Sequence, residues 1–191
     1  PRDILYEKFH IVPEKEYKEN MGGGIATTLY AKQAMVFNVE YFRANPVLFA
    51  ATAFHEVLHL KGHTAFEVRE EGEKTARKLY RAGVSTHSSM KAESDAGVSH
   101  GHFRGLHEAI VANQEKNILA KITELPELAE EKGWLASPEA QELKKKHSRD
   151  NKIPEDDFIW VWENGRDWEC IGYRWQRGVL AYVCDEIHRQ F

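Results

Sequence analysis

Residues 43–62 read "RANPVLFAATAFHEVLHLKG" and contain a complete set of signals for one helix. Asn45 is a typical N-cap, Pro46 suits the first helical position, and Gly62 can close the C-terminus. Apolar residues occupy almost every face between these ends, which is typical of a helix buried in a core. The sequence therefore predicts a buried helix of about sixteen residues, around which the rest of the domain is built.

The last turns of this helix carry His55, Glu56 and His59 in the pattern HExxH. Residues four apart lie on one face of a helix, so the two imidazoles can converge on one ion, most often zinc, at about 2.1 Å. Glu56, rotated by about 100° from His55, would lie beside the metal and could transfer a proton from a metal-bound water to a leaving amine. The alternative is an accidental match, but three ionisable side chains are costly to bury in an apolar helix without a partner.

The third metal ligand is not fixed by this motif. His63 continues the four-residue spacing, but in an unbroken helix it would lie about 12 Å along the axis from His55, with His59 between them. It could bind the same ion only if the chain turned back at Gly62. We expect His63 to be a helix-terminal residue or a contact of a ligand, with the ligand role as the alternative.

A second helix is predicted over about 103–124, "FRGLHEAIVANQEKNILAKITE", where apolar residues recur with helical spacing. HEVLH (55–59), followed about fifty residues later by a Glu-bearing helix at HEAIV (107–111), resembles the gluzincin branch of the zincin metallopeptidases. "FRGLHEAIVANQEK" is also similar to the second helix of uncharacterised bacterial zincin-like proteins. The resemblance covers roughly residues 1–124. The metzincin pattern HExxHxxGxxH fits less well, because Ala65 stands where that family has its third histidine.

The gluzincin resemblance implies that His55, His59 and Glu108 bind zinc and that Glu56 is the general base. The family motif on the second helix is ExxxD, but Ala112 stands here in place of the aspartate. The residue that orients a ligating histidine must then come from elsewhere or be absent. The alternative for Glu108 is an ion pair with Arg104, one turn before it.

The same resemblance implies a zinc-dependent metallopeptidase that hydrolyses peptide bonds. A peptide would add as a strand to the edge of the sheet beside the motif helix. A donor that stabilises the transition state is also needed, and the sequence does not choose among several candidates. These are Tyr80, His100, His102, Arg104, His107 and Tyr173. Two other functions fit the same residues: a non-catalytic zinc-binding interaction module, and a zinc hydrolase of non-peptide amides.

The predicted fold class is α+β, zincin-like, with a small antiparallel or mixed sheet, the motif helix, the Glu-bearing helix and a small C-terminal hairpin-helix subdomain. We place a boundary near residue 125, with a metallopeptidase core at 1–125 and the subdomain at 126–191. The other expected elements are a strand at 9–13, a hairpin within 21–39, a helix at 66–79, a strand at 80–85, a long loop at 86–102, a helix at 137–152 begun by Ser137 and Pro138, a type I′ hairpin about Asn164-Gly165, and a final helix at 176–191.

Composition limits the class of protein and its partners. The chain has 191 residues, of which 42% are hydrophobic and 29% charged, with a formal net charge of −4. These values are typical of a globular protein and give no basic excess for nucleic acid or apolar run for a membrane span. We expect a peptide or protein substrate and no nucleic-acid or membrane partner, and the oligomeric state is open. A cytoplasmic location is favoured, although a start at Pro1 leaves room for a removed leader or upstream domain.

Two features of the C-terminal region have structural interpretations. Cys170 and Cys184 cannot form a disulfide framework and are expected to be reduced, partly buried thiols. Trp168, Tyr173 and Trp175 are expected to pack into a small satellite core, with an exposed binding platform as the alternative.

Overall fold

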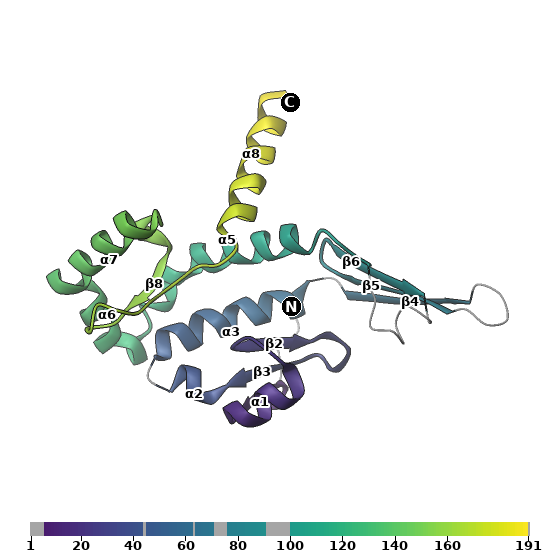
Figure 1. Ribbon diagram of the computed structural model, residues 1–191, viewed down its shortest axis with the longest axis horizontal. Coiled ribbons are helices and arrows are strands. Elements are labelled where there is room, and N and C mark those ends of the chain that lie inside the picture. Colours follow the sequence, from purple (N-terminus) through teal and green to yellow (C-terminus); the bar gives the residue numbers. More distant parts are fainter. Residues whose placement is uncertain (1–5, 44, 63, 71–75, 91–99, 191) are drawn as a thin grey trace.

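The computed structural model describes residues 6–43, 45–62, 64–70, 76–90 and 100–190. These residues form seven α-helices together with small mixed and antiparallel sheets, which confirms the α+β class. Two long helices run through the middle of the molecule, with a sheet below them and a second sheet extending from one end (Figure 1). Residues 126–170 lie at the other end, and the C-terminal helix projects upward from the middle (Figure 1). None of the helices in the described residues is both long and apolar enough to cross a membrane.

The N-terminal sheet is mixed and has the order β1-β3-β2. A 3-10 turn, η1 (Tyr6–Lys8), precedes β1 (Phe9–Val12), which is parallel to β3 (Ala34–Asn38), whereas β2 (Ala26–Leu29) is antiparallel to β3. The expected strand at 9–13 and the expected hairpin are confirmed, with η2 (Tyr30–Lys32) at the turn. Helix α1 (Glu14–Met21) joins β1 to β2, and α2 (Val39–Phe42) follows β3. β2 therefore lies at an edge of this sheet.

Helix α3 (Pro46–Lys61) has the predicted bounds and caps. The Asn45 side chain accepts a hydrogen bond from Leu48 N at 2.9 Å, and Gly62 N donates to Leu58 O at 3.0 Å. One face of α3 packs on the sheet, and α5 (Arg104–Ile122) runs antiparallel beside it (Figure 1). The shared core includes Met35, Phe37, Val47, Leu48, Ala51 and Ala112.

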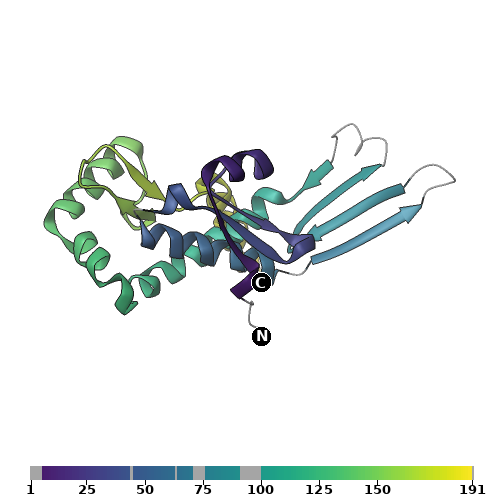
Figure 2. The ribbon, with the colours of Figure 1, turned by 90° about the horizontal axis from the view of Figure 1, so that it is seen from below.

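A second sheet, antiparallel in the order β4-β5-β6-β7, lies between α3 and α5 in the chain and extends away from both (Figure 2). Its strands are β4 (Thr64–Glu70), β5 (Ala76–Ala82), β6 (Ser85–Met90) and β7 (His100–His102). The predicted helix at 66–79 is therefore wrong. Glu, Lys and Arg favour a helix locally, but cross-strand pairing from Thr64↔Ala82 to Glu70↔Ala76 overrides that weak preference.

Two neighbouring predictions also need correction. The predicted strand at 80–85 spans the end of β5, a turn at Gly83-Val84 and the first residue of β6. Gly83 has a φ of 55°, which suits that turn. The predicted loop at 86–102 is instead strand at both ends, in β6 and β7, and residues 91–99 of it lie outside the described residues.

The C-terminal elements begin with η3 (Pro126–Leu128) and α6 (Ala129–Ala136), followed by α7 (Pro138–Asn151), whose Ser137 cap is confirmed. A short 3-10 turn, η4 (Glu155–Asp157), leads into the hairpin of β8 (Phe158–Val161) and β9 (Trp168–Cys170), and α8 (Arg174–Gln190) follows. The hairpin is confirmed but its type I′ turn is wrong. Only Gly165 of the pair has positive φ, and the Asn164 side chain instead accepts a hydrogen bond from Arg166 N.

The C-terminal aromatic residues divide into two groups. Trp168 packs against a small cluster of Ala140, Ile153, Phe158 and Val161, as predicted. Trp175 is 82% exposed and Tyr173 is 39% exposed, so the satellite-core prediction is wrong for these two residues. Both cysteines are free thiols; Cys170 is half-buried as predicted, whereas Cys184 is exposed, so the predicted burial is wrong for Cys184. The boundary near residue 125 stays a prediction.

Candidate metal centre

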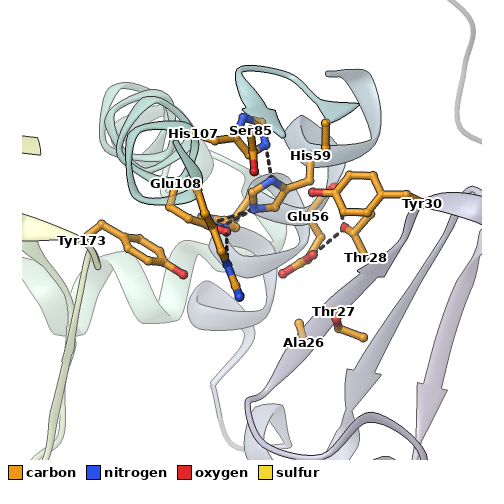
Figure 3. A pocket seen from close by; sticks show the side chains of 13 residues that line it. Ala26, Thr27, Thr28, Tyr30, Glu56, His59, Ser85, His107, Glu108 and Tyr173 are labelled. Atoms are coloured by element: carbon orange, nitrogen blue, oxygen red, sulfur yellow. Dashed lines mark hydrogen bonds and ion pairs between the residues drawn. The ribbon is translucent and has the colours of Figure 1, made fainter. Parts of the chain in front are cut away.

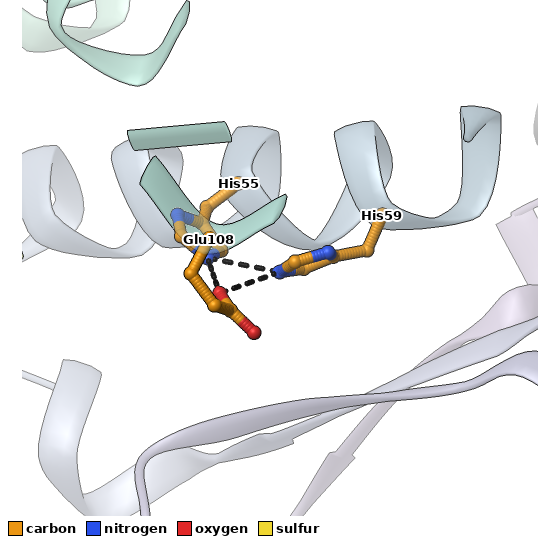
Figure 4. A group of neighbouring side chains, drawn as sticks. All are labelled: His55, His59 and Glu108. Carbon is orange, nitrogen blue, oxygen red and sulfur yellow. Dashed lines mark hydrogen bonds and ion pairs between the residues drawn. The ribbon is translucent and has the colours of Figure 1, made fainter. Parts of the chain in front are cut away.

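The structure brings His55, His59 and Glu108 together at the contact between α3 and α5 (Figure 4). His55 and His59 lie one turn apart on α3, and the antiparallel α5 directs Glu108 between their rings. The Nε2 atoms of the two histidines are 3.1 Å apart, and Glu108 Oε2 lies 3.5 Å from His55 Nε2 and 3.2 Å from His59 Nε2. These three side chains form a group that could hold a metal ion.

The separations fit a tetrahedral ion. Ligand atoms bound to zinc at about 2.0–2.1 Å with tetrahedral angles lie roughly 3.3 Å from one another. The three measured separations of 3.1, 3.2 and 3.5 Å lie around that value. His59 and Glu108 are buried and His55 is nearly so, so the donors are held by packing and not by chance contact at a flexible surface.

Glu115 provides the orienting contact that the sequence left unassigned. It lies seven residues after Glu108, two turns along the same face of α5, and its Oε2 is 3.0 Å from His55 Nδ1. A carboxylate can only accept a hydrogen bond, so His55 donates its Nδ1 proton to Glu115. His55 Nε2 then faces the other two candidate metal-binding atoms. Sequence reasoning missed Glu115 because it looked four residues after Glu108, where Ala112 stands. The seven-residue spacing of Glu108 and Glu115, which places both on one face of the helix, could have indicated this contact.

His107 does the same for the second histidine. Its Nε2 lies 2.9 Å from His59 Nδ1, and burial together with the nearby His59 lowers the pKa of His107, which keeps it neutral. A neutral His107 can accept the Nδ1 proton of His59, which leaves His59 Nε2 with the free lone pair that a metal requires. The turn at Gly83 lies against this ring, since a Cβ at Gly83 would be 2.5 Å from two of its atoms. His107, a candidate transition-state donor from sequence, therefore contacts a ligand.

The ion pair between Arg104 and Glu108 is also present but weaker. Arg104 Nε lies 3.9 Å from Glu108 Oε1, and the arginine side chain is 74% exposed. An exposed pair of this kind contributes little in water. The other oxygen of Glu108 faces the two histidines, so both alternatives for Glu108 coexist and the buried contacts dominate.

Glu56 lies beside the three candidate metal ligands and points towards the N-terminal sheet (Figure 3). It is 8% exposed, and its Oε2 accepts a hydrogen bond of 2.5 Å from Thr28 Oγ1 of the edge strand β2. The same hydroxyl lies 3.2 Å from the backbone oxygen of Glu56. Thr28 therefore holds the Glu56 carboxylate between β2 and the candidate metal site.

Tyr173 approaches the site from the opposite side, ahead of α8 (Figure 3). Its ring stacks on His55 at 6.4 Å between centroids. Burial and the neighbouring carboxylate of Glu108 raise the pKa of Tyr173 to about 12, so its hydroxyl remains a proton donor at neutral pH. Of the six donor candidates named from sequence, Tyr173, Arg104 and His107 line the pocket described below.

A buried ion pair holds the backbone that presents Tyr173. Tyr173 has a left-handed φ of 57°, and Arg177 Nε donates a hydrogen bond of 3.0 Å to Gly172 O just before it. The Arg177 guanidinium also binds both carboxylate oxygens of Asp157, at 3.2 and 2.5 Å, and Lys116 Nζ lies 2.7 Å from Asp157 Oδ1. Although burial opposes ionisation, the bonds from Arg177 and Lys116 lower the pKa of Asp157.

A pocket of about 240 Å³ joins these groups. Ala26, Thr27 and Thr28 of β2 form one wall, and the histidines, Glu108 and Tyr173 form the opposite wall (Figure 3). His102, another candidate donor, is exposed in β7. The side chains of Tyr80 and His100 lie outside the described part of the structure, and so does the whole of His63.

The chain matches no protein-family model, no curated protein and no solved structure. The case for a function therefore rests on the residues and their geometry.

Removing Glu115 should weaken metal binding. Glu115→Ala leaves His55 without the acceptor that fixes its tautomer and ring orientation, so we expect zinc affinity to fall about 10- to 100-fold. Competition with a chelating dye measures the affinity. Gln114→Ala, next to it on the exposed side of α5, is the matched control and should bind as the parent does. Equal affinities of the Glu115 variant and the parent would contradict the orienting role.

The charge on His55 gives a pH-dependent signature in protein stripped of metal. Burial opposes the charge, but hydrogen bonds to Glu108 and Glu115 outweigh it and raise the pKa of His55 to about 10. The contribution of this charged imidazole to the free energy of unfolding is fully present below about pH 6.5. It is lost as the pH rises through about 10. NMR shifts of the imidazole nitrogens should show His55 protonated at pH 8. A ring already neutral at that pH would disprove the proposed contacts.

Proposed function

We propose that this protein is a zinc-dependent metallopeptidase of the gluzincin type. The observation that carries the proposal is the tetrahedral spacing of His55, His59 and Glu108 on the wall of a pocket that also holds the Glu56 carboxylate. Two imidazoles and one carboxylate are a ligand set typical of catalytic zinc, and imidazole ligands favour zinc over magnesium or calcium.

An open ligand set favours catalysis over a purely structural site. Within the described residues, the group that could hold an ion has three members. A structural zinc is usually enclosed by four protein ligands, whereas a catalytic zinc keeps one position for water or substrate. A structural site also has no need of a carboxylate such as Glu56 beside it. The non-catalytic interaction module remains the second candidate, and it would require His63 as the fourth ligand.

The chemistry would be divided among residues already placed. A zinc ion, when bound, would lower the pKa of a coordinated water and polarise the substrate carbonyl. Glu56 takes the proton from the attacking water and delivers it to the leaving amine. Thr28 holds the Glu56 carboxylate through its 2.5 Å hydrogen bond. Tyr173 stays protonated and lies across the pocket from β2. Its hydroxyl donates a hydrogen bond to the oxygen that gains negative charge in the transition state.

The substrate is proposed to be a peptide because β2 offers backbone at the pocket. Of the described strands, β2 pairs only with β3, so its other edge is available for an extended chain. Ala26, Thr27 and Thr28 of this strand line the pocket, which would place the peptide bond of an added strand beside Glu56. A small non-peptide amide would use the same catalytic groups without needing this edge.

The first test separates metal binding from turnover. We expect about one zinc per chain by elemental analysis, lost in Glu108→Ala and retained in His63→Ala. Glu56→Gln keeps the ligands but removes the base, so it should retain zinc while peptide cleavage falls by at least roughly 10²- to 10⁴-fold. Mass spectrometry of a mixed peptide library after incubation measures the cleavage.

Each other outcome of that test has a definite meaning. Zinc that persists in Glu108→Ala and is lost in His63→Ala would overturn the gluzincin ligand set. Full activity of Glu56→Gln would contradict the proposed base. Hydrolysis of acylated small amines with no cleavage in the peptide library would keep the chemistry and overturn the peptide substrate.

Tyr173→Phe should affect the chemical step. The substitution removes only the hydroxyl, so zinc content and KM should be nearly unchanged while kcat falls about 10²- to 10³-fold, as for loss of an oxyanion donor. Tyr6→Phe, at a tyrosine that is 89% exposed, is the matched control. An unchanged kcat for Tyr173→Phe would exclude the tyrosine as the donor.

A further inference from the structure

Helix α8 is fixed to the body only near its start. Gln176 lies so close to Gly105 of α5 that a Cβ on that glycine would be 3.1 Å from it, and Arg177 is held by Asp157. Beyond Gly178 the helix rises away from α5 and projects from the molecule (Figure 1), and most of its side chains are exposed. An isolated helical segment of about twelve residues is only marginally stable in water. Packing against a partner would therefore stabilise this projecting part.

The projecting helix carries an exposed apolar ridge. Trp175, Val179, Val183 and Ile187 follow one another at intervals of four residues, and Tyr182 lies beside them. Their exposed fractions are 82% for Trp175, 61% for Val179, 45% for Val183, 53% for Ile187 and 63% for Tyr182. A shallow hollow of about 350 Å³ lies between Trp175, Val179 and Tyr182, where Gly178 has no side chain. Singly exposed apolar residues are common, but a continuous ridge with a hollow beside it is typical of a contact surface.

The apolar ridge residues of α8 are placed symmetrically about Ala181. Trp175 mirrors Ile187, Val179 mirrors Val183 and Leu180 mirrors Tyr182. A two-fold axis through an antiparallel helix pair brings such mirrored positions together, because each surface then meets its own copy.

The charges on α8 favour the same orientation. Of its charged residues, Arg174 is exposed in the first half and Asp185 in the second, whereas Arg177 is bound to Asp157 and Glu186 pairs with Arg189. An antiparallel pair places the half with Arg174 along the half with Asp185 of the second copy, and it also opposes the two helix dipoles. A parallel pair would bring like charges together.

From these observations we propose that two copies of this chain pair through the α8 ridge as an antiparallel, two-fold symmetric contact. A ridge of residues four apart packs into the equivalent groove of a second helix at a crossing angle of about −50°. Covering two aromatic and three branched side chains on each copy would remove on the order of 1,000 Å² from water, the lower end for a specific interface. Tyr173 and the metal ligands lie outside the contact, so the pairing is independent of the proposed activity.

Sedimentation analysis of the full chain tests the pairing. The mass should rise with concentration from that of one chain, 22.0 kDa, towards twice that value. Val179→Glu should abolish this rise, because it places a charge in the ridge. Ala181→Glu, also exposed but on the other side of the helix, is the matched control and should still pair. Circular dichroism verifies that both variants are folded. A monomer up to about 1 mM, or a dimer unaffected by Val179→Glu, would overturn the proposal.

Disulfide trapping tests the orientation. In a Cys184→Ser background, Val179→Cys and Val183→Cys chains are oxidised separately and as a mixture. The antiparallel pair brings position 179 to position 183 of the second copy, so the mixture should form the crosslinked heterodimer in preference to either homodimer. Homodimers of each single variant with no heterodimer enrichment would show a parallel pair and contradict the proposed contact.

Discussion

The antiparallel contact of α3 with α5 is the interaction on which the rest of the structure depends. It buries two histidines of one helix against Glu108 and Glu115 of the other. Buried ionisable groups are costly unless each has a partner, and here both of these carboxylates face an imidazole. The helices can approach closely because Ala112 of α5, which is fully buried in the core shared with α3, has a small side chain. An aspartate at 112 would occupy that packed position, whereas Glu115 reaches His55 from one turn further along.

The parts of the fold that could be predicted from sequence are those specified locally. Asn45, Pro46 and Gly62 fix the ends of α3 through capping and backbone geometry, and the bounds agree with the structure. The helix predicted at 66–79 failed because β4 and β5 are stabilised by pairing with each other, which local preference does not reveal. The same limit applies to the loop predicted at 86–102, whose ends are strands within a sheet.

The site could be predicted in part for a similar reason. His55, Glu56 and His59 follow from helix spacing, and Glu108 was reached through the gluzincin resemblance. Glu115 and His107 depend on how α5 is rotated against α3, which spacing within one helix does not determine. Thr28 and Tyr173 come from segments far away in the chain and meet the site only through the packing of β2 and of the Asp157–Arg177 pair. The sequence therefore predicted the candidate ligands better than the groups around them.

We propose that His55, His59 and Glu108 bind one zinc ion that keeps an open position. X-ray absorption at the zinc edge of the loaded protein measures the ligand atoms directly. We expect two imidazoles, one carboxylate oxygen and one non-protein oxygen at about 2.0–2.1 Å. A third imidazole in place of the carboxylate, or four protein ligands with no exchangeable oxygen, would contradict it.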